Sequence, residues 1–305
     1  MKMNNRIYGV IGIKSIMSNW NADFNGRPKS LSNGDVFGSD KAFKYPIKRM
    51  WQAAGEKVLY IKSYKIDNGK MQPNKLNERY TVLFGSILDE KTSSKDVLGN
   101  LFSAIDVMNF GATFAEKNQS IGITGAVQIG QGMNRYEEHR VTTQPILSPF
   151  RNSNKEDADQ SSLGTKIISD EAHYFYPFSV NPNNYDDYTI LDIKNFEGYT
   201  KEAYEKFKKG CLIGATAYNT NSKSGCENEF ALFIECKEDS LLYLANIDSY
   251  IGFSKNDSKN RIDFTRLSEL ISKHLDQIEK IEVYYNEMDT EVELAGLSCS
   301  SYPLY

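Results

Sequence analysis

Hydrophobic positions along the chain follow two patterns, short β-branched runs and stripes at helical spacing. The short runs predict strands at residues 6–16, 57–66, 119–130, 171–180, 230–236 and 280–286. The stripes predict amphipathic helices at residues 41–54, 95–109, 200–219 and 263–275, with Asp263 as the expected cap of the last. This order predicts an α+β domain with long insertions. An antiparallel ferredoxin-like sheet, as in RNA-recognition modules (RRM-like), fits it.

Two long polar stretches interrupt these elements. Residues 17–40 form a loop rich in Asn and Gly, in which Trp20, Phe24 and Phe37 are interspersed. Loops of this length inside a compact domain are usually functional or disordered, and we expect exposed aromatic side chains here. Residues 131–170 are polar and contain RNSNKEDADQSS, which predicts a projecting hairpin or loop that buries little apolar surface.

The helix predicted at residues 41–54 has one apolar and one basic face. Its apolar stripe consists of Phe43, Ile47, Met50, Trp51 and Ala54. Lys41, Lys44 and Lys48 fall on the opposite face, with Arg49 at its edge. Pro46 leaves two interpretations open, because the regular helix either begins at this residue or continues through it with a kink.

The composition is that of a globular protein. The 305 residues fit two ordinary domains or one domain with large insertions, and 40% are hydrophobic and 25% charged. No apolar run approaches the roughly 18 residues of a membrane span, and no signal peptide is recognisable, so we expect no membrane association. The four cysteines show neither CxxC pairing nor zinc-type spacing, which favours a reducing cytoplasm; they are Cys211, Cys226, Cys236 and Cys299.

The net charge of −4 is unevenly distributed. Residues 1–75 contain 14 Lys and Arg against 5 Asp and Glu, a net of +9, so the remainder has 22 against 35, a net of −13. A basic region attracts phosphates even on an acidic protein, and a chain polarised in this way suits head-to-tail stacking. Charge asymmetry also occurs in proteins that neither bind nucleic acid nor stack. Charge alone therefore does not decide whether this chain does either.

The loop at 17–40 and the basic helix after it are the best candidate site. Asn, Ser and backbone amides can hydrogen-bond phosphate and ribose, and Lys neutralises phosphate charge. The start of the helix adds N–H donors, and aromatic side chains can stack on unpaired bases. Residue types alone do not exclude a solvated helix face beside an ordinary loop.

Three sequence patterns resemble known catalytic or cofactor-binding motifs but lack the residues that such a site needs. DEAH at 170–173 lacks the phosphate loop that a helicase needs, so we expect His173 to be a packed strand residue. GQGMNR at 130–135 lacks the third glycine of a dinucleotide fingerprint, and the nearby glycines, at 122, 125, 130 and 132, are expected to let a backbone or ligand approach the strand. No histidine accompanies Asp23, Asp35 and Asp40, whose turn and cap roles are the simpler explanation, so we expect no metal or other cofactor.

Several stretches, taken in order, resemble the backbone subunit of type I CRISPR Cascade complexes, the Cas-seven family within the RAMP superfamily. The resemblance is closest to the type I-B, DevR-like branch. It covers nearly the whole chain, and the stretches that carry it are RIYGVIGIKSIMSNWNADFNGRPKS, GSDKAFKYPIKRMW, DVMNFGATF, ITGAVQIGQGMNRY, TTQPILSPF and SSLGTKIISDEAHYFYPFSVNP. No single stretch is diagnostic, but their joint order is highly specific.

The resemblance implies one RRM-like domain over residues 1–305. The central sheet and its helices, called the palm, would have a finger-like insertion at about 60–118 and a projecting thumb-like hairpin at 132–170. Copies would stack along the CRISPR guide RNA (crRNA) in the cytoplasm, without catalysis, together with other Cascade subunits and the target DNA strand paired to the guide. The RNA-binding residues that the resemblance implies are Asn19, Asn21, Ser39, Lys41, Lys44, Lys48, Arg49, Gln128, Gln131, Arg135, Thr165 and Lys166.

Two alternatives stay open. Related type III backbone proteins cut target RNA with a loop aspartate, so Asp23 is the candidate for a metal-dependent endoribonuclease. A free regulatory RNA-binding protein, which would lack stacking partners, is the other.

Overall fold

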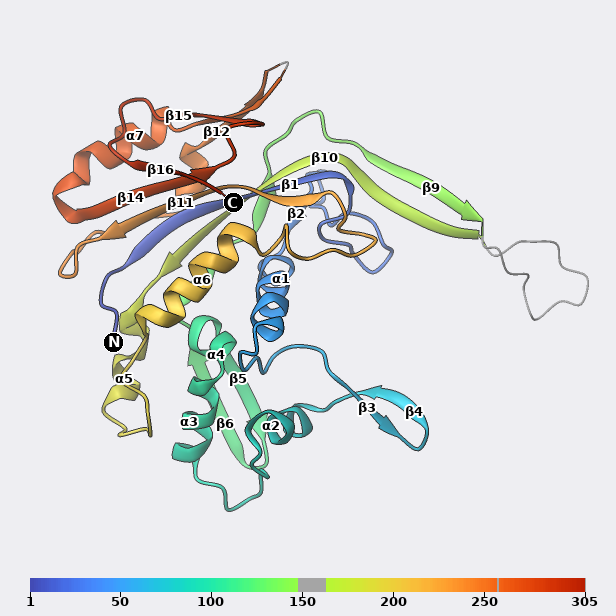
Figure 1. Cartoon of the computed structure of the whole chain (residues 1–305), viewed down its shortest axis with the longest axis vertical. Helices are drawn as coiled ribbons and strands as arrows, with labels where there is room; N and C mark the ends of the chain where they lie inside the picture. Colours follow the sequence, from blue (N-terminus) through green and yellow to red (C-terminus); the bar gives the residue numbers. More distant parts are fainter. Residues whose placement is uncertain (148–162, 257, 305) are drawn as a thin grey trace, which may run out of the picture.

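The computed structural model describes residues 1–147, 163–256 and 258–304, and its centre is a large mixed sheet (Figure 1). The strands follow the order β16-β14-β11-β1-β10-β8-β2, and β7 and β9 also pair with β10. The long strands are β1 (Ile7–Ser18), β10 (Leu163–Val180), β11 (Cys226–Cys236) and β14 (Ile278–Tyr285). The short ones are β2 (Phe37–Gly38), β7 (Val127–Ile129), β8 (Gly132–Asn134), β9 (Val141–Leu147) and β16 (Ser300–Pro303).

The sheet is antiparallel except at one edge. Strand β1 pairs with β10 and β11, with Ile11 opposite Tyr176 and Ala231, and β11 pairs with β14 in the same sense. Strand β16 joins β14 in parallel, which makes the sheet mixed. The predicted α+β class is confirmed.

Different layers cover the two faces of the sheet, because successive residues of a strand point to opposite sides. On one side Ile7 and Ile11 pack in a core with α1 (Asp40–Ala53) and α6 (Lys201–Ile213). On the other side Tyr8 and Val10 pack in a second core with α7 (Thr265–Ile271) and a small sheet. The elements of this second layer are η2 (Ile247–Tyr250), β12 (Gly252–Lys255), β13 (Asn260–Asp263), η3 (Ser272–Gln277) and β15 (Thr290–Glu293).

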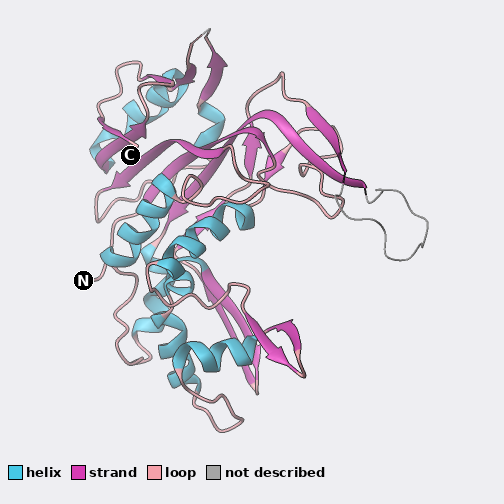
Figure 2. Ribbon diagram, turned by 45° about the vertical axis from the view of Figure 1, so that its right-hand side comes forward, coloured by secondary structure: helices cyan, strands magenta, loops and turns pink. Residues whose placement is uncertain are grey.

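A third body lies below the sheet in Figure 1, and its core continues the first one. Its helices are α2 (Leu76–Phe84), α3 (Ser94–Ser103) and α4 (Ile105–Phe110), with η1 (Pro182–Tyr185) and α5 (Asp186–Thr189) beside them. Its hairpins are β3 (Tyr64–Asp67) with β4 (Lys70–Pro73), and β5 (Gly111–Glu116) with β6 (Gln119–Thr124). Figures 1 and 2 show that the β3–β4 and β9–β10 hairpins project from the same side of the molecule, with α1 between them.

Most predicted elements exist, but several boundaries were wrong. The strand predicted at 57–66 is confined to its last residues, because the N–H groups of Leu59 and Tyr60 donate to the Asp106 carboxylate instead of to another strand. The helix predicted at 95–109 breaks at Ala104, which has extended backbone angles, into α3 and α4. The helix predicted from residue 200 is capped by Thr200 and ends at Ile213.

Two predicted strands and one predicted helix also differ from their expected boundaries. The strand predicted at 119–130 breaks into β6 and β7 at Gly125, where a Cβ would lie 2.2 Å from the backbone of Phe110. The strand predicted at 171–180 begins at Leu163. The helix predicted at 263–275 is α7 followed by η3, and its N-cap residue is Phe264, not Asp263. Asp263 ends β13, and its carboxylate accepts the Thr265 N–H. The segment RNSNKEDADQSS lies outside the described residues.

Candidate nucleic-acid interface

Helix α1 is fixed by its apolar face, and Lys41 and Arg49 outside that face are exposed to solvent. Ser39 caps the helix, with its hydroxyl accepting the Ala42 N–H. Ile47 fits against Gly210 of α6, where an added Cβ would lie 2.5 Å from Ile47 Cγ2. Trp51 Nε1 donates to the carbonyl of Lys206 at 3.1 Å. The helix begins at Asp40, so Pro46 lies in its interior and not in its first turn.

The cations on the basic face of α1 differ in whether they form an ion pair with another side chain. Lys41 and Arg49 are exposed, and neither has an ion-pair partner among the residues that the structure describes. Lys44 forms an ion pair with Asp40 one turn before it, with Nζ 2.9 Å from Oδ2. Lys41 and Arg49 therefore offer full charges to an anion, whereas Lys44 must first be released from Asp40.

Lys48 is the internal counter-ion of a buried aspartate, so the prediction that it lies on a solvated face is wrong. Its Nζ lies 3.1 Å from Oδ2 of Asp106, whose side chain is 0% exposed. The same ammonium donates to the carbonyl of Tyr60 at 3.2 Å. Because Asp106 also accepts the backbone N–H groups of Leu59 and Tyr60, this network joins α1 to the segment that leads into β3.

Asp40 competes with any anion for the start of α1. Burial alone would raise the pKa of its carboxyl, but hydrogen bonds from Lys44 and Gln131 and the charge of Lys44 hold that pKa below its ordinary value. Asp40 is therefore ionised at neutral pH, at the end of the helix that the backbone dipole makes positive.

The loop at 17–40 is ordered, and β-bridges between its own residues help to fix its shape. Isolated bridges join Ala22 to Pro28 and Ser30 to Val36. Asn19 is buried, and its amide donates to the carbonyls of Gly26 and Ile167. The side-chain oxygen of Asn21 accepts the Ser39 N–H at 2.8 Å, which fixes the start of α1. Both asparagines thus shape the loop with groups that were predicted to contact RNA.

The aromatic side chains of this loop are mostly not available for stacking. Trp20 is fully buried and donates from Nε1 to the Tyr176 hydroxyl at 2.6 Å. Phe37 is half-buried, and Phe24 alone of the three is fully exposed. Asp23 caps the turn that carries Phe24, because its Oδ1 accepts the N–H groups of Asn25 and Arg27.

The structure brings five of the twelve predicted RNA-binding residues together at the start of α1. Strand β2 pairs with β8, and Asp40 bonds to Gln131 just before β8. The predicted residues that gather here are Asn21, Ser39, Lys41, Lys44 and Gln131. Lys29 also belongs to this cluster and was missed, since its N–H donates to the Asn21 carbonyl and its ammonium lies 5.5 Å from the Phe37 ring centroid. Its place in the basic segment 1–75 was the available signal.

Four other predicted residues lie apart from this cluster. Gln128 faces the opposite side of the sheet, in a cavity of about 310 Å³ with Tyr8 and Ile247. Arg135 is paired with Asp248 of η2 at 2.5 Å. Thr165 and Lys166 lie opposite Pro145 and Gln144 on the projecting β9–β10 hairpin.

The DEAH histidine is a packed strand residue, as predicted. His173 is fully buried, with Nδ1 2.8 Å from a Glu229 oxygen and Nε2 3.0 Å from a Glu171 oxygen. Lys255 and Asn260 donate to the same two carboxylates. Burial alone would lower the pKa of His173, but the two carboxylates raise it above its ordinary value. The expectation that a backbone approaches the nearby glycines holds at Gly125, which lies against the backbone of Phe110, whereas an added Cβ at Gly132 would meet the Tyr176 ring and one at Gly122 would meet nothing within 4 Å.

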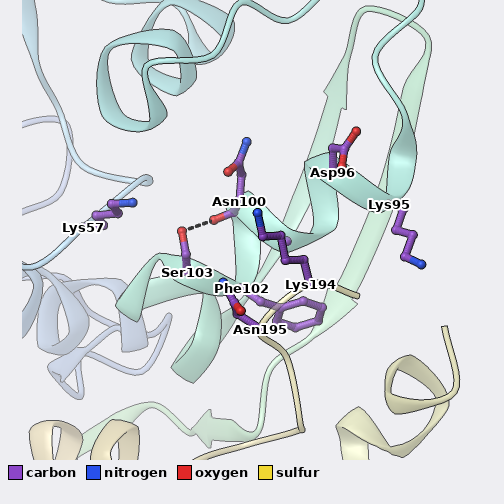
Figure 3. Close-up of a pocket in the computed structure, with 9 residues that line it drawn as sticks. Lys57, Lys95, Asp96, Asn100, Phe102, Ser103, Lys194 and Asn195 are labelled. Carbon is purple, nitrogen blue, oxygen red and sulfur yellow. Dashed lines mark hydrogen bonds between the residues drawn. The ribbon is translucent and has the colours of Figure 1, made fainter. Parts of the chain in front are cut away.

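A separate pocket of about 370 Å³ lies beside α3 (Figure 3). Lys57, Lys95 and Lys194 line it from three different segments, and the Ser103 hydroxyl donates to the carbonyl of Asn100 at 2.7 Å. Asp96 also lines the pocket, and Lys95 pairs with Asp192 at 2.7 Å, so carboxylates offset part of the charge of the three lysines.

The residues that the structure describes contain neither a candidate membrane-spanning helix nor a candidate metal site. None of the helices there combines the length and hydropathy of a transmembrane helix. No group of three or more His, Cys, Asp or Glu side chains in that part of the chain is arranged to hold a metal ion. All four cysteines are free thiols.

Comparisons with known proteins agree with one another. A family model described as "CRISPR-associated protein Cas7" matches residues 5–272. One similar solved structure, titled "CRISPR RNA-guided surveillance complex", has a TM-score of 0.51 at 14% identity and covers 96% of this chain and 94% of that chain. Another, titled "CRISPR RNA-guided surveillance complex, pre-nicking", has a TM-score of 0.55 at 11% identity and covers 98% and 96%. No curated protein matches. At sequence identities this low, the structural matches establish that the fold is shared.

Proposed function

This chain belongs to the CRISPR-associated protein Cas7 family, and from that premise we propose that it is a non-catalytic guide-RNA-binding subunit. Copies of it stack along the crRNA and form the backbone of a type I-B Cascade surveillance complex for antiviral defence in the cytoplasm. Its other partners are further Cascade subunits and the target DNA strand paired to the guide. The observation that carries this proposal is the solvent-facing basic side of α1, with Lys41 and Arg49 free of ion-pair partners in the described part of the chain.

The proposed binding mode follows from the chemistry of that face. Lysine and arginine contact phosphates regardless of sequence, so a guide of any sequence can be held by its backbone. The base edges then stay free to pair with a target strand, as RNA-guided recognition requires. Lys29, Lys41, Lys44 and Arg49 supply the charge in this scheme.

The same proposal assigns roles to the projecting parts. The sheet with α1 and α6 is the RRM-like palm, residues 60–118 are the finger-like insertion, and residues 132–170 are the thumb-like hairpin. The position of α1 between the β3–β4 and β9–β10 hairpins supports this division (Figures 1 and 2). Thr165 and Lys166 would then meet RNA from the thumb, away from the cluster at α1.

The test is whether the purified chain carries RNA of discrete length. The protein is purified at low salt, and bound nucleic acid is extracted, sized and sequenced. RNA of discrete length, released as salt is raised, is the expected result, since each phosphate contact contributes a slope of roughly −0.7 to the log–log salt dependence. Protein that carries no RNA and binds none added in vitro would refute the proposal.

A further inference from the structure

The β3–β4 hairpin has an apolar face that no described residue covers. Tyr64 lies opposite Pro73 and Ile66 opposite Met71, so these four side chains share one face. Tyr64, Ile66 and Met71 are 51%, 72% and 67% exposed. A two-stranded hairpin with an open apolar face is marginally stable in water, and such a patch marks a binding surface.

The hairpin is held in shape from its other face and its turn. Lys65 Nζ lies 2.6 Å from Glu78 of α2, which anchors the polar face. Asn68 and Gly69 form the turn with φ values of 48° and 72°, the combination that a tight hairpin turn requires. The apolar face is therefore presented on a defined backbone.

The hairpin and its flanking residues are rich in lysine, of which Lys65 and Lys70 lie on the face opposite Tyr64, and Lys65 is paired with Glu78. Residues 62–75 contain four lysines, Lys62, Lys65, Lys70 and Lys75, and one acid, Asp67, which gives a net of +3. The Lys62 ammonium lies 5.1 Å from the Tyr64 ring centroid, so cation and aromatic ring are presented together. Lysine is depleted in protein–protein interfaces, whereas cations interleaved with an aromatic ring are typical of surfaces that bind single-stranded nucleic acid.

The hairpin also lies in the right place for such a strand. It projects on the same side of the molecule as the β9–β10 hairpin, and α1 lies between the two (Figures 1 and 2). We infer that the apolar face of β3–β4 contacts the bases of the nucleic-acid strand held along α1, with Tyr64 stacking on an unpaired base and Ile66 and Met71 packing beside it. Lys62, whose ammonium lies beside the Tyr64 ring, faces a flanking phosphate. This inference rests on the proposed function.

The experiment uses the full-length chain and single-stranded RNAs that contain 2-aminopurine at successive positions. Stacking on Tyr64 quenches the fluorescence at one or more positions. Tyr64→Ala removes that quenching and weakens binding about tenfold, which is about 1.4 kcal/mol, whereas Tyr64→Phe retains both. Tyr243→Ala is the matched control, because Tyr243 is 69% exposed and carries Arg6 over its ring at 4.5 Å, but is not on the hairpin.

The possible results separate this inference from the proposed function. If the parent binds RNA and Tyr64→Ala changes neither quenching nor affinity, the hairpin contact is refuted while the RNA-binding proposal stands. If Tyr64→Ala lowers self-association in sedimentation and leaves quenching intact, the face belongs to an interface between copies, and the inference is overturned. If the parent binds no RNA, the proposed function fails first.

Discussion

Lys48 on α1 and Asp106 on α4 are 58 positions apart in the sequence and form a partly buried ion pair, with Nζ 3.1 Å from Oδ2. Asp106 also fixes the backbone of Leu59 and Tyr60, so one carboxylate sets the position of α1 relative to the segment that leads into the β3–β4 hairpin. Lys48 therefore supports the candidate interface from inside, and we expect its neighbours on the helix to make the contacts with an anion.

Replacing Lys48 by Met should destabilise the fold, because the charge of Asp106 would stay buried without its counter-ion. The expected loss in the free energy of unfolding is about 3 kcal/mol. Denaturant unfolding measures it. Lys41→Met, the same change at an exposed position of the same helix, should stay within about 0.5 kcal/mol of the parent. Equal stability of the two variants would show that Asp106 does not depend on Lys48.

Lys41→Ala with Arg49→Ala should weaken RNA binding without loss of stability, because both side chains are exposed and neither forms an ion pair among the described residues. Affinity should fall alike for unrelated RNA sequences. The slope of log affinity against log salt should become shallower by about 1.4 for two lost phosphate contacts. Fluorescence anisotropy over a salt series tests this, and a change confined to one RNA sequence would point to base contacts instead.

The sequence predicted those parts of the fold that depend on local pattern. The apolar stripe of α1 was recognised because Phe43, Ile47 and Trp51 face one core, and helical spacing alone reveals such a face. The role of Lys48 could not be predicted, since its partner Asp106 comes from a distant part of the chain and only the folded contact shows the pairing.

Irregular backbone explains the remaining differences at the site. The break at Gly125 separates β6 from β7. Because side chains alternate along a strand, the hydrophobic pattern before such a break does not predict which face of the sheet Gln128 occupies after it. Asn21 and Ser39 were chosen for their polar groups, and the structure shows those groups used in shaping the loop and capping α1. Polar residue type predicts hydrogen bonding and leaves the partner open.

We expect no cleavage of RNA by this chain with Mg²⁺ or Mn²⁺. The Asp23 carboxylate is engaged by two backbone N–H groups of its own turn, which is a structural use of the side chain. Labelled complementary RNA incubated with the RNA-loaded protein tests this. Cleavage that disappears in Asp23→Asn, which keeps an oxygen acceptor for the turn, would establish the endoribonuclease alternative.

The contribution of His173 to stability should decrease with rising pH. Its folded-state pKa lies above the ordinary value of 6.5, so the protonated ring stabilises the fold fully below about pH 6.5. That contribution is lost as the pH rises through the folded-state pKa, because a neutral ring cannot donate to both Glu171 and Glu229. The pKa of Glu171 is lowered, so its own contribution is lost only in acid, in a separate range.

Denaturant unfolding between pH 6 and pH 9 measures this effect. His173→Gln should be less stable than the parent at pH 6, and the difference should narrow toward pH 9. His274→Gln on η3 is the same chemical change away from the two carboxylates and should leave the pH dependence unaltered. A difference for His173→Gln that does not vary with pH would mean that the ring is neutral throughout.

Asp40→Asn should strengthen RNA binding. The carboxylate holds Lys44 at 2.9 Å and places a negative charge at the start of α1, so phosphate must displace it. Its removal frees the Lys44 ammonium and leaves the positive end of the helix dipole for the ligand, while the Ser39 cap remains. The expected gain is roughly threefold at low ionic strength, shrinking as salt screens the charges. Asp35→Asn is the matched control, since it changes the net charge equally on the same loop but its carboxylate bonds only to Asn33 among the described residues. Anisotropy titrations of both variants at several salt concentrations separate the effects. If the two variants gain equally, the gain comes from net charge, and Lys44 is not a phosphate contact.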